Sequence, residues 1–265
     1  MTPVFRKTLR GSGPAGGHPD FFAAEAAGLR WLADTGAPVV RVISVGEDAI
    51  ELEQLDSARP TREAARAFGA ALARMHDAAV PHFGSPPADS EGNPFAGQLF
   101  IGRRELSSVE YDSWGRFYAR ERVEPYLRPA RDAGNLTAAD EDAVREACEL
   151  IADGVFDDGE PPSRIHGDLW NGNVMWTSRG VVMIDPAAHG GHRETDLAML
   201  ALFGCPLLDE ILGAYADEHP LVAGWQDRIA VHQLHPLAVH AAGHGPGYGA
   251  SLGRAARESS ALARG

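Results

Sequence analysis

The sequence predicts an α+β protein in which a small β-rich N-terminal lobe precedes a larger helical lobe. Between residues 39 and 55, β-branched and acidic residues dominate, as in strands that bury one face. From Thr61 onward, apolar residues mostly recur at the spacing of amphipathic helices. The chain has 265 residues, of which 44% are hydrophobic, and this is enough to bury two lobes. We therefore expect a bilobal molecule divided into residues 1–55 and 56–265.

The first predicted strand ends at Lys7, which is the only lysine among the 24 basic residues of the chain. A lysine ammonium is a compact charge, so a site shaped for it against phosphate oxygens does not readily accept arginine. A helix is predicted from Asp20, as its N-cap, to Asp34, and it carries Glu25. A strand lysine followed by a helical glutamate is the order found in the nucleotide lobe of a protein kinase. The alternative is a surface lysine near an exposed glutamate.

The larger lobe is predicted to be mostly helical, with no internal repeat. Amphipathic patterns predict helices over residues 61–78, 108–123, 137–152, 195–203 and 222–242.

One segment of the larger lobe reads as strands around polar loops. Predicted strands at residues 164–166 and 174–176 flank a polar tip, and the apolar run 180–184 ends at Asp185. Such a hairpin would hold Asn173 and Asp185 near one another at strand ends.

The spacing of Asp168, Asn173 and Asp185 suits metal-assisted phosphoryl transfer. In the D-x-x-x-x-N interval of a kinase catalytic loop, the Asp receives the proton of the acceptor hydroxyl and the Asn binds magnesium. Asn173 and Asp185 could share a hard cation that prefers oxygen ligands, which implies Mg²⁺. Asp and Asn also form ordinary turns, but the second carboxylate favours the kinase interpretation. We expect His166 to brace the backbone near Asp168, and Asp196 to accept backbone amides at a helix start.

The segment HGDLWNGN at 166–173, followed by DPAAHGGHRETDLAM at 185–199, resembles the fructosamine-kinase family, a branch of the aminoglycoside-phosphotransferase and protein-kinase-like fold. Similarity runs from about Val4 to Gly249. The resemblance implies a bilobal protein-kinase-like fold and an ATP-dependent kinase that phosphorylates the C3 hydroxyl of fructosamine or ribulosamine adducts. In this family the phosphorylated product is unstable and releases the amine, which makes the reaction a protein-repair step.

The same resemblance assigns roles to residues around the expected ATP site. It implies that adenine lies against Glu53 and Leu55, in the ELEQL connection between the lobes, with Lys7 on the phosphates and Glu25 holding Lys7. It also implies that the indole of Trp170 lines the sugar-amine pocket, whereas the alternative is a core aromatic residue.

The family carries a hairpin with a glycine-rich loop before the lysine strand, whereas six residues precede Lys7 here. We expect that translation starts upstream of Met1. The alternatives are ATP binding without this cover, or a lost activity that leaves a catalytically silent binding module.

A glycine-rich run occurs after the lysine instead. Residues 11–16, GSGPAG, match the dinucleotide pattern G-x-G-x-x-G. Pro14 leaves no amide donor where phosphate would bind, and the preceding strand carries Arg6, Lys7 and Arg10 rather than apolar residues. We therefore reject a nicotinamide oxidoreductase and interpret the run as a connection.

The formal net charge of −13 argues against nucleic acid as a partner. It suits a cationic acceptor such as a ketosamine, or the alternatives, an aminoglycoside, choline or another amino alcohol. The chain shows no signal peptide and no apolar run long enough to span a membrane, so we expect a cytoplasmic protein with no membrane partner. Cys148 and Cys205 lack metal-binding or redox spacing, and the eleven histidines show no zinc-ligand motif.

Overall fold

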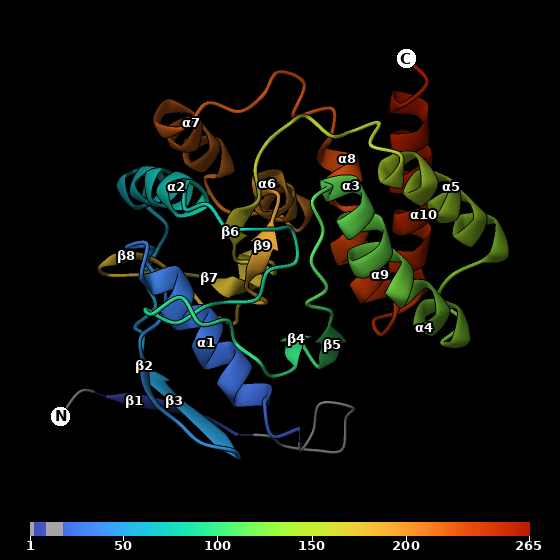
Figure 1. Cartoon of the computed structure of the whole chain (residues 1–265). Helices are drawn as coiled ribbons and strands as arrows, with labels where there is room; N and C mark the ends of the chain where they lie inside the picture. The colour runs from blue at the N-terminus through green and yellow to red at the C-terminus, as the bar shows by residue number, and fades with distance from the viewer. Residues whose placement is uncertain (1–2, 9–17) are drawn as a thin grey trace. The chain divides into compact units, whose positions relative to one another are not determined.

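The computed structural model describes residues 3–8 and 18–265, which form two compact units (Figure 1). Of the described residues, the first unit contains 3–8, 18–81, 85–108 and 162–221, and the second contains 82–84, 109–161 and 222–265. The mixture of small sheets and helices confirms the predicted α+β class. The predicted lobes, residues 1–55 and 56–265, divide the chain differently from these two units, and they stay a prediction. The glycine-rich run 11–16 lies outside the described residues.

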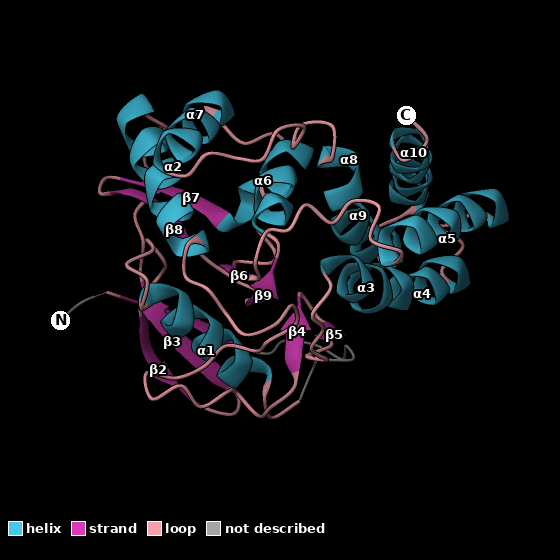
Figure 2. Cartoon of the chain, turned by 45° about the horizontal axis from the view of Figure 1, so that its top comes forward, coloured by secondary structure: helices cyan, strands magenta, loops and turns pink. Residues whose placement is uncertain are grey.

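The N-terminal sheet of the first unit has the order β1-β3-β2 and is antiparallel. Its strands are β1 (Val4–Thr8), β2 (Val42–Val45) and β3 (Ala49–Glu53). Helix α1 (Phe21–Ala33) packs on this sheet (Figure 2) and buries Phe22 and Leu29 against Ile50 and Leu52. Lys7 pairs with Ile50, and side chains of directly opposed residues share one face of a sheet. The register therefore turns Lys7 toward α1, the helix that carries Glu25.

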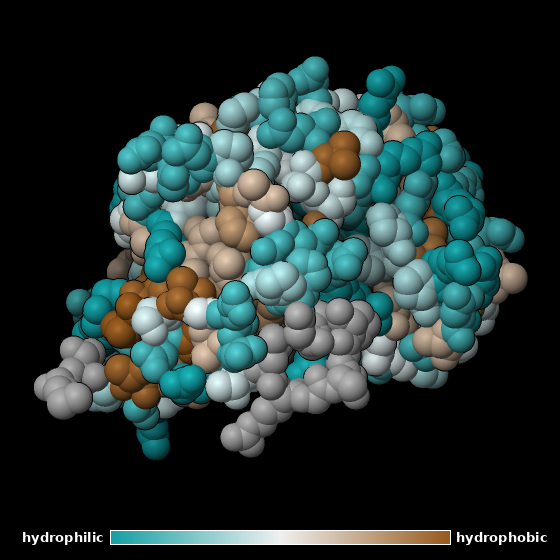
Figure 3. All heavy atoms as spheres, turned by 60° about the horizontal axis from the view of Figure 1, so that its bottom comes forward, coloured by the Kyte–Doolittle hydropathy of each residue, from teal (hydrophilic) through white to brown (hydrophobic). Residues whose placement is uncertain are grey.

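Apolar side chains gather at the lower left of the face drawn in Figure 3. Among the described residues, the exposed large apolar side chains of the N-terminal sheet are Val4, Phe5, Ile43 and Val45. Phe5, on the edge strand β1, is 53% exposed.

Helix α1 begins where the sequence predicts, but its first turn is built differently. Asp20 occupies the N-cap position without capping the helix through its side chain. Its Oδ2 instead accepts a hydrogen bond from the Gln98 amide at 2.9 Å. The Asp20 carboxylate, which the sequence predicts to cap its own helix, thus accepts from Gln98, a residue 78 positions away.

The rest of the first unit includes the segment that carries Asp168, Asn173 and Asp185. It contains α2 (Arg62–His76), α6 (Arg193–Leu202), α7 (Leu208–Glu218) and three two-stranded sheets. These pair β4 (Leu99–Ile101) with β5 (Arg104–Leu106), β6 (Ser163–Ile165) with β9 (His189–Gly191), and β7 (Val174–Thr177) with β8 (Gly180–Met183). The predicted hairpin at 174–184 is therefore present, whereas β4, β5 and β9 were not anticipated.

Helices α2 and α7 approach each other closely at Gly69. A Cβ atom at that position would lie 2.1 Å from the Ile211 carbonyl oxygen and 3.1 Å from the Tyr215 nitrogen. Only glycine fits this contact, which brings the buried face of α7 against α2.

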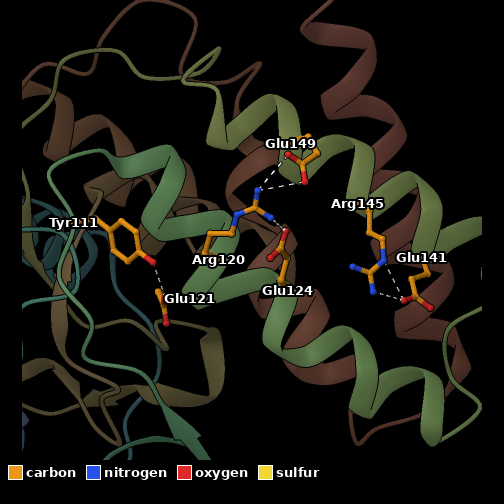
Figure 4. Close-up of polar contacts among 7 residues, drawn as sticks. All are labelled: Tyr111, Arg120, Glu121, Glu124, Glu141, Arg145 and Glu149. Carbon is orange, nitrogen blue, oxygen red and sulfur yellow. Dashed lines mark hydrogen bonds and ion pairs between the residues drawn. The ribbon is translucent and has the colours of Figure 1, made fainter.

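The second unit is helical in its described elements. It contains α3 (Trp114–Phe117), the π-helix η1 (Tyr118–Val123), the 3₁₀-helix η2 (Glu124–Tyr126), α4 (Leu127–Asp132), α5 (Ala138–Ala152), α8 (Ile229–His232), α9 (Leu234–Ala241) and α10 (Pro246–Leu262). Arg120 of η1 forms ion pairs with Glu124 and with Glu149 of α5 (Figure 4). The Tyr111 hydroxyl donates to Glu121 at 2.9 Å.

Two predicted helices of the second unit are shorter than expected. The helix predicted over 108–123 begins only at Trp114, because the extended segment before it pairs Tyr111 with Phe83. The helix predicted over 222–242 begins at Ile229 and is interrupted at Gln233.

The interruption at Gln233 follows from Pro236, which has no N–H to donate to the His232 carbonyl. The Tyr118 hydroxyl lies 2.7 Å from that carbonyl oxygen and accepts from the His235 amide at 3.0 Å. The sequence did not predict helix α10.

No helix in the described part of the chain combines the length and the apolar composition that crossing a membrane requires.

Candidate active site

Lys7 lies between two carboxylates of the first unit. Its Nζ donates to Glu25 Oε2 at 2.9 Å and to Asp185 Oδ1 at 2.8 Å. Glu25 comes from the buried side of α1, and Asp185 follows β8. The structure thus brings together a strand lysine, a helical glutamate and the second carboxylate of the predicted triad.

The pKa values of Lys7 and Glu25 are both raised, but for different reasons. Burial alone would lower the pKa of Lys7, but the Glu25 and Asp185 carboxylates raise it above its usual value. Burial raises the pKa of Glu25, although the Lys7 ammonium opposes this shift and the Asp185 charge adds to it. The ammonium is therefore held in its charged form between two acids.

The backbone at Asp185 is unusual, because its φ of 53° lies in the left-handed region. Few residues other than glycine, chiefly Asn and Asp, adopt this conformation. The Ile184 amide just before it donates to the Asn173 carbonyl at 3.0 Å, so the end of β8 is fastened to the loop that carries Asn173. Backbone strain of this kind collects at functional sites.

Asn173, the last residue of the 3₁₀-helix η3 (Asn171–Asn173), bridges the other two members of the triad. Its Nδ2 donates to the Asp168 carbonyl at 2.8 Å, to Asp168 Oδ2 at 3.0 Å and to the Asp185 carbonyl at 3.4 Å. With the amide nitrogen turned toward these acceptors, the amide oxygen is left for another ligand. An amide oxygen and a carboxylate form a donor set that suits a hard cation such as Mg²⁺.

The Asp168 carboxyl group is enclosed strongly enough to hold a proton. Burial raises the pKa of Asp168 to about 8, the hydrogen bond from Asn173 opposes the shift, and the charges of Asp185 and Asp196 add to it.

The loop before Asp168 is braced by Asp196, near the start of α6. Asp196 Oδ2 accepts from the His166 amide at 2.7 Å, and Oδ1 accepts from the Gly167 amide at 2.9 Å. The His166 ring lies 3.0 Å from the Ile184 carbonyl through Nε2, and the Asp168 amide donates to its Nδ1 at 3.3 Å. Helix α6 begins two residues earlier than predicted, because the His192 side chain caps it by accepting from the Glu194 amide.

These groups open on one pocket of about 240 Å³ in the first unit. Four catalytic candidates line it, Lys7, Asp168, Asn173 and Asp185, together with Glu25 and Trp170. Its other lining residues are Phe21, Ala24, Leu99, Phe100, Gly102, Pro186, Ala187 and Ala188.

Part of the pocket wall was missed from the sequence. Leu99, Phe100 and Gly102 come from the β4–β5 hairpin, which carries no motif that predicts a site. Phe100 packs edge-on against Phe21 of α1, with ring centroids 5.2 Å apart. A hairpin that contacts α1 thus forms a wall of the same pocket.

The Trp170 indole is held in place by two neighbours. It meets the Phe203 ring edge-on at 5.9 Å between centroids. It also covers Gly172, where a Cβ atom would lie 2.3 Å from the indole ring. The glycine therefore leaves the space into which the indole folds.

The two residues expected near adenine are not among those that line this pocket. The Glu53 carboxylate lies 3.5 Å from Arg179 and 4.0 Å from Arg41, so its side chain is engaged elsewhere. Leu55 packs at the margin of the apolar cluster beneath α1. Within residues 3–8 and 18–265, the Leu55 amide donates to no backbone carbonyl.

Comparison with known proteins shows which family the chain resembles. A solved structure from Thermobifida fusca that carries a fructosamine-3-kinase assignment is 44% identical, with a TM-score of 0.88 over 98% of this chain and 86% of that chain. The ketosamine-3-kinase of Mus musculus is 35% identical over 144 residues, which are 53% of this chain and 45% of the mouse protein.

More distant structures share the fold alone. An aminoglycoside phosphotransferase bound to ADP and hygromycin B is 16% identical, with a TM-score of 0.58 over 94% of this chain and 84% of that chain. These neighbours confirm the protein-kinase-like fold that the sequence predicts. The family model described as fructosamine kinase matches residues 15–259, and the chain belongs to the fructosamine kinase family.

Proposed function

We propose that this kinase transfers the γ-phosphoryl group of ATP to the C3 hydroxyl of a ketosamine. The observation that carries the proposal is the convergence of Lys7, Asp168, Asn173 and Asp185 on one pocket of about 240 Å³. Phosphoryl transfer requires little covalent chemistry from a protein, so positioning and charge neutralisation supply most of the catalysis.

Lys7 and Glu25 are proposed to bind the nucleotide phosphates. The Nζ of Lys7 lies 2.9 Å from Glu25, which orients the ammonium, and its contact with Asp185 at 2.8 Å can be exchanged for a phosphate oxygen. The adenine would bind at residues 53–55, where the Leu55 amide is available to a ring nitrogen. The aminoglycoside phosphotransferase structure with the same fold contains ADP, which supports a nucleotide in this fold.

Asn173 and Asp185 are proposed to hold Mg²⁺ through the Asn173 amide oxygen and the Asp185 carboxylate. When bound, the ion supplies positive charge that neutralises the phosphates and favours the ionised form of Asp168. Asp168 orients the acceptor hydroxyl and takes up its proton as the oxygen attacks the γ-phosphorus in line. His166 and Asp196 hold the backbone that carries Asp168.

The acceptor would lie against Trp170, which lines the same pocket as Asp168. A sugar ring packs well on an indole face, and the negative charge of the chain favours a substrate that carries a protonated amine. An aminoglycoside, choline or another amino alcohol is the alternative acceptor. The Lys7 contacts favour an active kinase over a silent binding module, because the ammonium is already oriented by Glu25.

The proposal is tested by ATP consumption with fructosyl-lysine, ribulosyl-lysine, an aminoglycoside and choline as acceptors. We expect the highest kcat/KM for the two ketosamines, with phosphate on C3 of the product by ³¹P NMR. A higher kcat/KM for choline or the aminoglycoside would replace the ketosamine as acceptor. Absence of both turnover and a Mg-ATP thermal shift would identify a silent module.

Substitution of Gly172 by Ala tests the acceptor wall. The new Cβ would lie 2.3 Å from the Trp170 ring, so the indole must move. We expect KM for the ketosamine to rise about fivefold to tenfold, with KM for ATP unchanged, because a misplaced wall weakens acceptor binding. Gly213→Ala is the matched control, since no atom lies within 4 Å of its added Cβ. An unchanged acceptor KM in Gly172→Ala would remove Trp170 from the acceptor site.

A further inference from the structure

A buried histidine outside the pocket contacts the residue that braces the catalytic loop. His76 lies at the end of α2 and is 2% exposed. Its Nε2 is 3.1 Å from Asp196 Oδ2, and its Nδ1 is 2.8 Å from the Tyr215 hydroxyl of α7. His76 does not line the pocket, so it acts on the reaction only through its neighbours.

Asp196 links this histidine to the loop of Asp168. The same oxygen that faces His76 accepts the His166 amide at 2.7 Å, and the other oxygen accepts the Gly167 amide at 2.9 Å. Burial would raise the pKa of Asp196, but the His76 hydrogen bond, with the contacts of His166, lowers it below its usual value. A fully buried carboxylate therefore stays ionised and can hold two backbone amides.

The hydrogen bonds also select one tautomer of His76. The ionised Asp196 carboxylate can only accept, so the proton lies on Nε2. In the neutral ring, Nδ1 then accepts from the Tyr215 hydroxyl. Gly69 allows the close contact of α2 and α7 that brings Tyr215 to this position. Both ring nitrogens of His76 thus have a hydrogen-bond partner, an acceptor at Nε2 and a donor at Nδ1.

We propose that His76 is a positioning residue of the phosphoryl transfer, which orients Asp196 and through it the His166 and Gly167 amides that place Asp168. Tyr215 holds the His76 ring in place through its hydrogen bond to Nδ1. This inference rests on the proposed function for its kinetic consequence, whereas the structural consequence for the loop does not depend on any substrate.

Two amide substitutions of His76 separate the effect of the hydrogen bond to Asp196 from the effect of the ring volume. In His76→Gln, the amide nitrogen can reach the place of Nε2 and still donate to Asp196. In His76→Asn, the amide nitrogen corresponds to Nδ1, so the donor to Asp196 is lost. We expect His76→Asn to lower kcat about tenfold to a hundredfold with KM for ATP and for the ketosamine unchanged, and His76→Gln to stay within about threefold of the wild type.

Amide hydrogen exchange over residues 166–168 gives a readout without substrate. We expect faster exchange in His76→Asn and wild-type exchange in His76→Gln. Equal losses of kcat in both variants, a loss carried by KM, or wild-type kcat and exchange in His76→Asn would overturn the proposal. If the wild type phosphorylates no acceptor, the proposed function fails, and the exchange experiment still decides whether His76 positions the loop.

Tyr215→Phe provides a second variant in case His76→Asn does not fold. It removes one hydroxyl and leaves the packing of α2 on α7 in place. We expect kcat to fall about threefold with both KM values unchanged, because one of the two hydrogen bonds that hold the ring in position is lost. If only this variant folds, wild-type kcat and exchange in it would overturn the proposal.

Discussion

Replacement of Asp168 by Asn is expected to lower kcat by about a thousandfold while the protein still folds and binds Mg-ATP. The Asn side chain keeps the shape and the acceptor for the Asn173 amide, which lies 3.0 Å away, but it cannot take up the proton of the acceptor hydroxyl. Steady-state kinetics with the ketosamine and a Mg-ATP thermal shift measure the two parts of this expectation.

Asp142→Asn is the matched control for this substitution, because Asp142 is exposed and lies on α5 of the second unit. Its kcat should equal that of the wild type. Turnover retained within tenfold by Asp168→Asn would remove Asp168 from the role of base.

The same variant should change how stability depends on pH. Burial raises the pKa of Asp168 to about 8 in the folded, ligand-free chain, whereas an unfolded aspartate titrates near about 4. Between these values the folded state binds the proton that the unfolded state has lost, so the free energy of unfolding falls as pH rises. Urea unfolding with a chelator should therefore show Asp168→Asn gaining stability over the wild type from pH 5 to pH 8. A constant difference over this range would contradict the buried carboxyl group.

Replacement of Asp185 by Asn is expected to lower kcat by about a hundredfold or more at ordinary Mg²⁺ concentrations, and to raise the Mg²⁺ concentration needed for half-maximal rate. Asn tolerates the left-handed φ of 53° at this position, so the substitution removes the charge without adding backbone strain. Rates measured over a Mg²⁺ titration separate the two effects.

Asp185→Ala serves as the comparison for backbone strain. Alanine loses the charge as well and is poorly suited to a left-handed backbone, so it should also lower the melting temperature, whereas Asp185→Asn should not. An unchanged Mg²⁺ requirement in Asp185→Asn would exclude Asp185 as a metal ligand.

The parts of the site that the sequence predicted are those whose geometry is local. Asp168 and Asn173 are five positions apart in one loop, and the β7–β8 hairpin necessarily returns the chain to Asp185. Lys7 and Glu25 are further apart, but a strand and the helix packed on it leave few arrangements. In these cases spacing and secondary structure were sufficient.

The rest depends on contacts between distant segments that have no local signal. Phe100 enters the pocket wall from a short hairpin, and Asp20 gives its acceptor to Gln98 instead of its own helix. His76 was one of eleven histidines, and only the approach of α7 at Gly69 shows what it contacts. Long-range packing decides such positions, and single-sequence patterns do not record it.

The ion pairs of Lys7 also bear on its own chemical reactivity. A sugar carbonyl condenses only with a neutral amine, and the two carboxylates that raise the pKa of Lys7 keep this amine protonated. The single lysine side chain of the chain is thereby a poor nucleophile for Schiff-base formation. A kinase acting on glycated amines thus presents almost no side-chain amine that could itself become glycated.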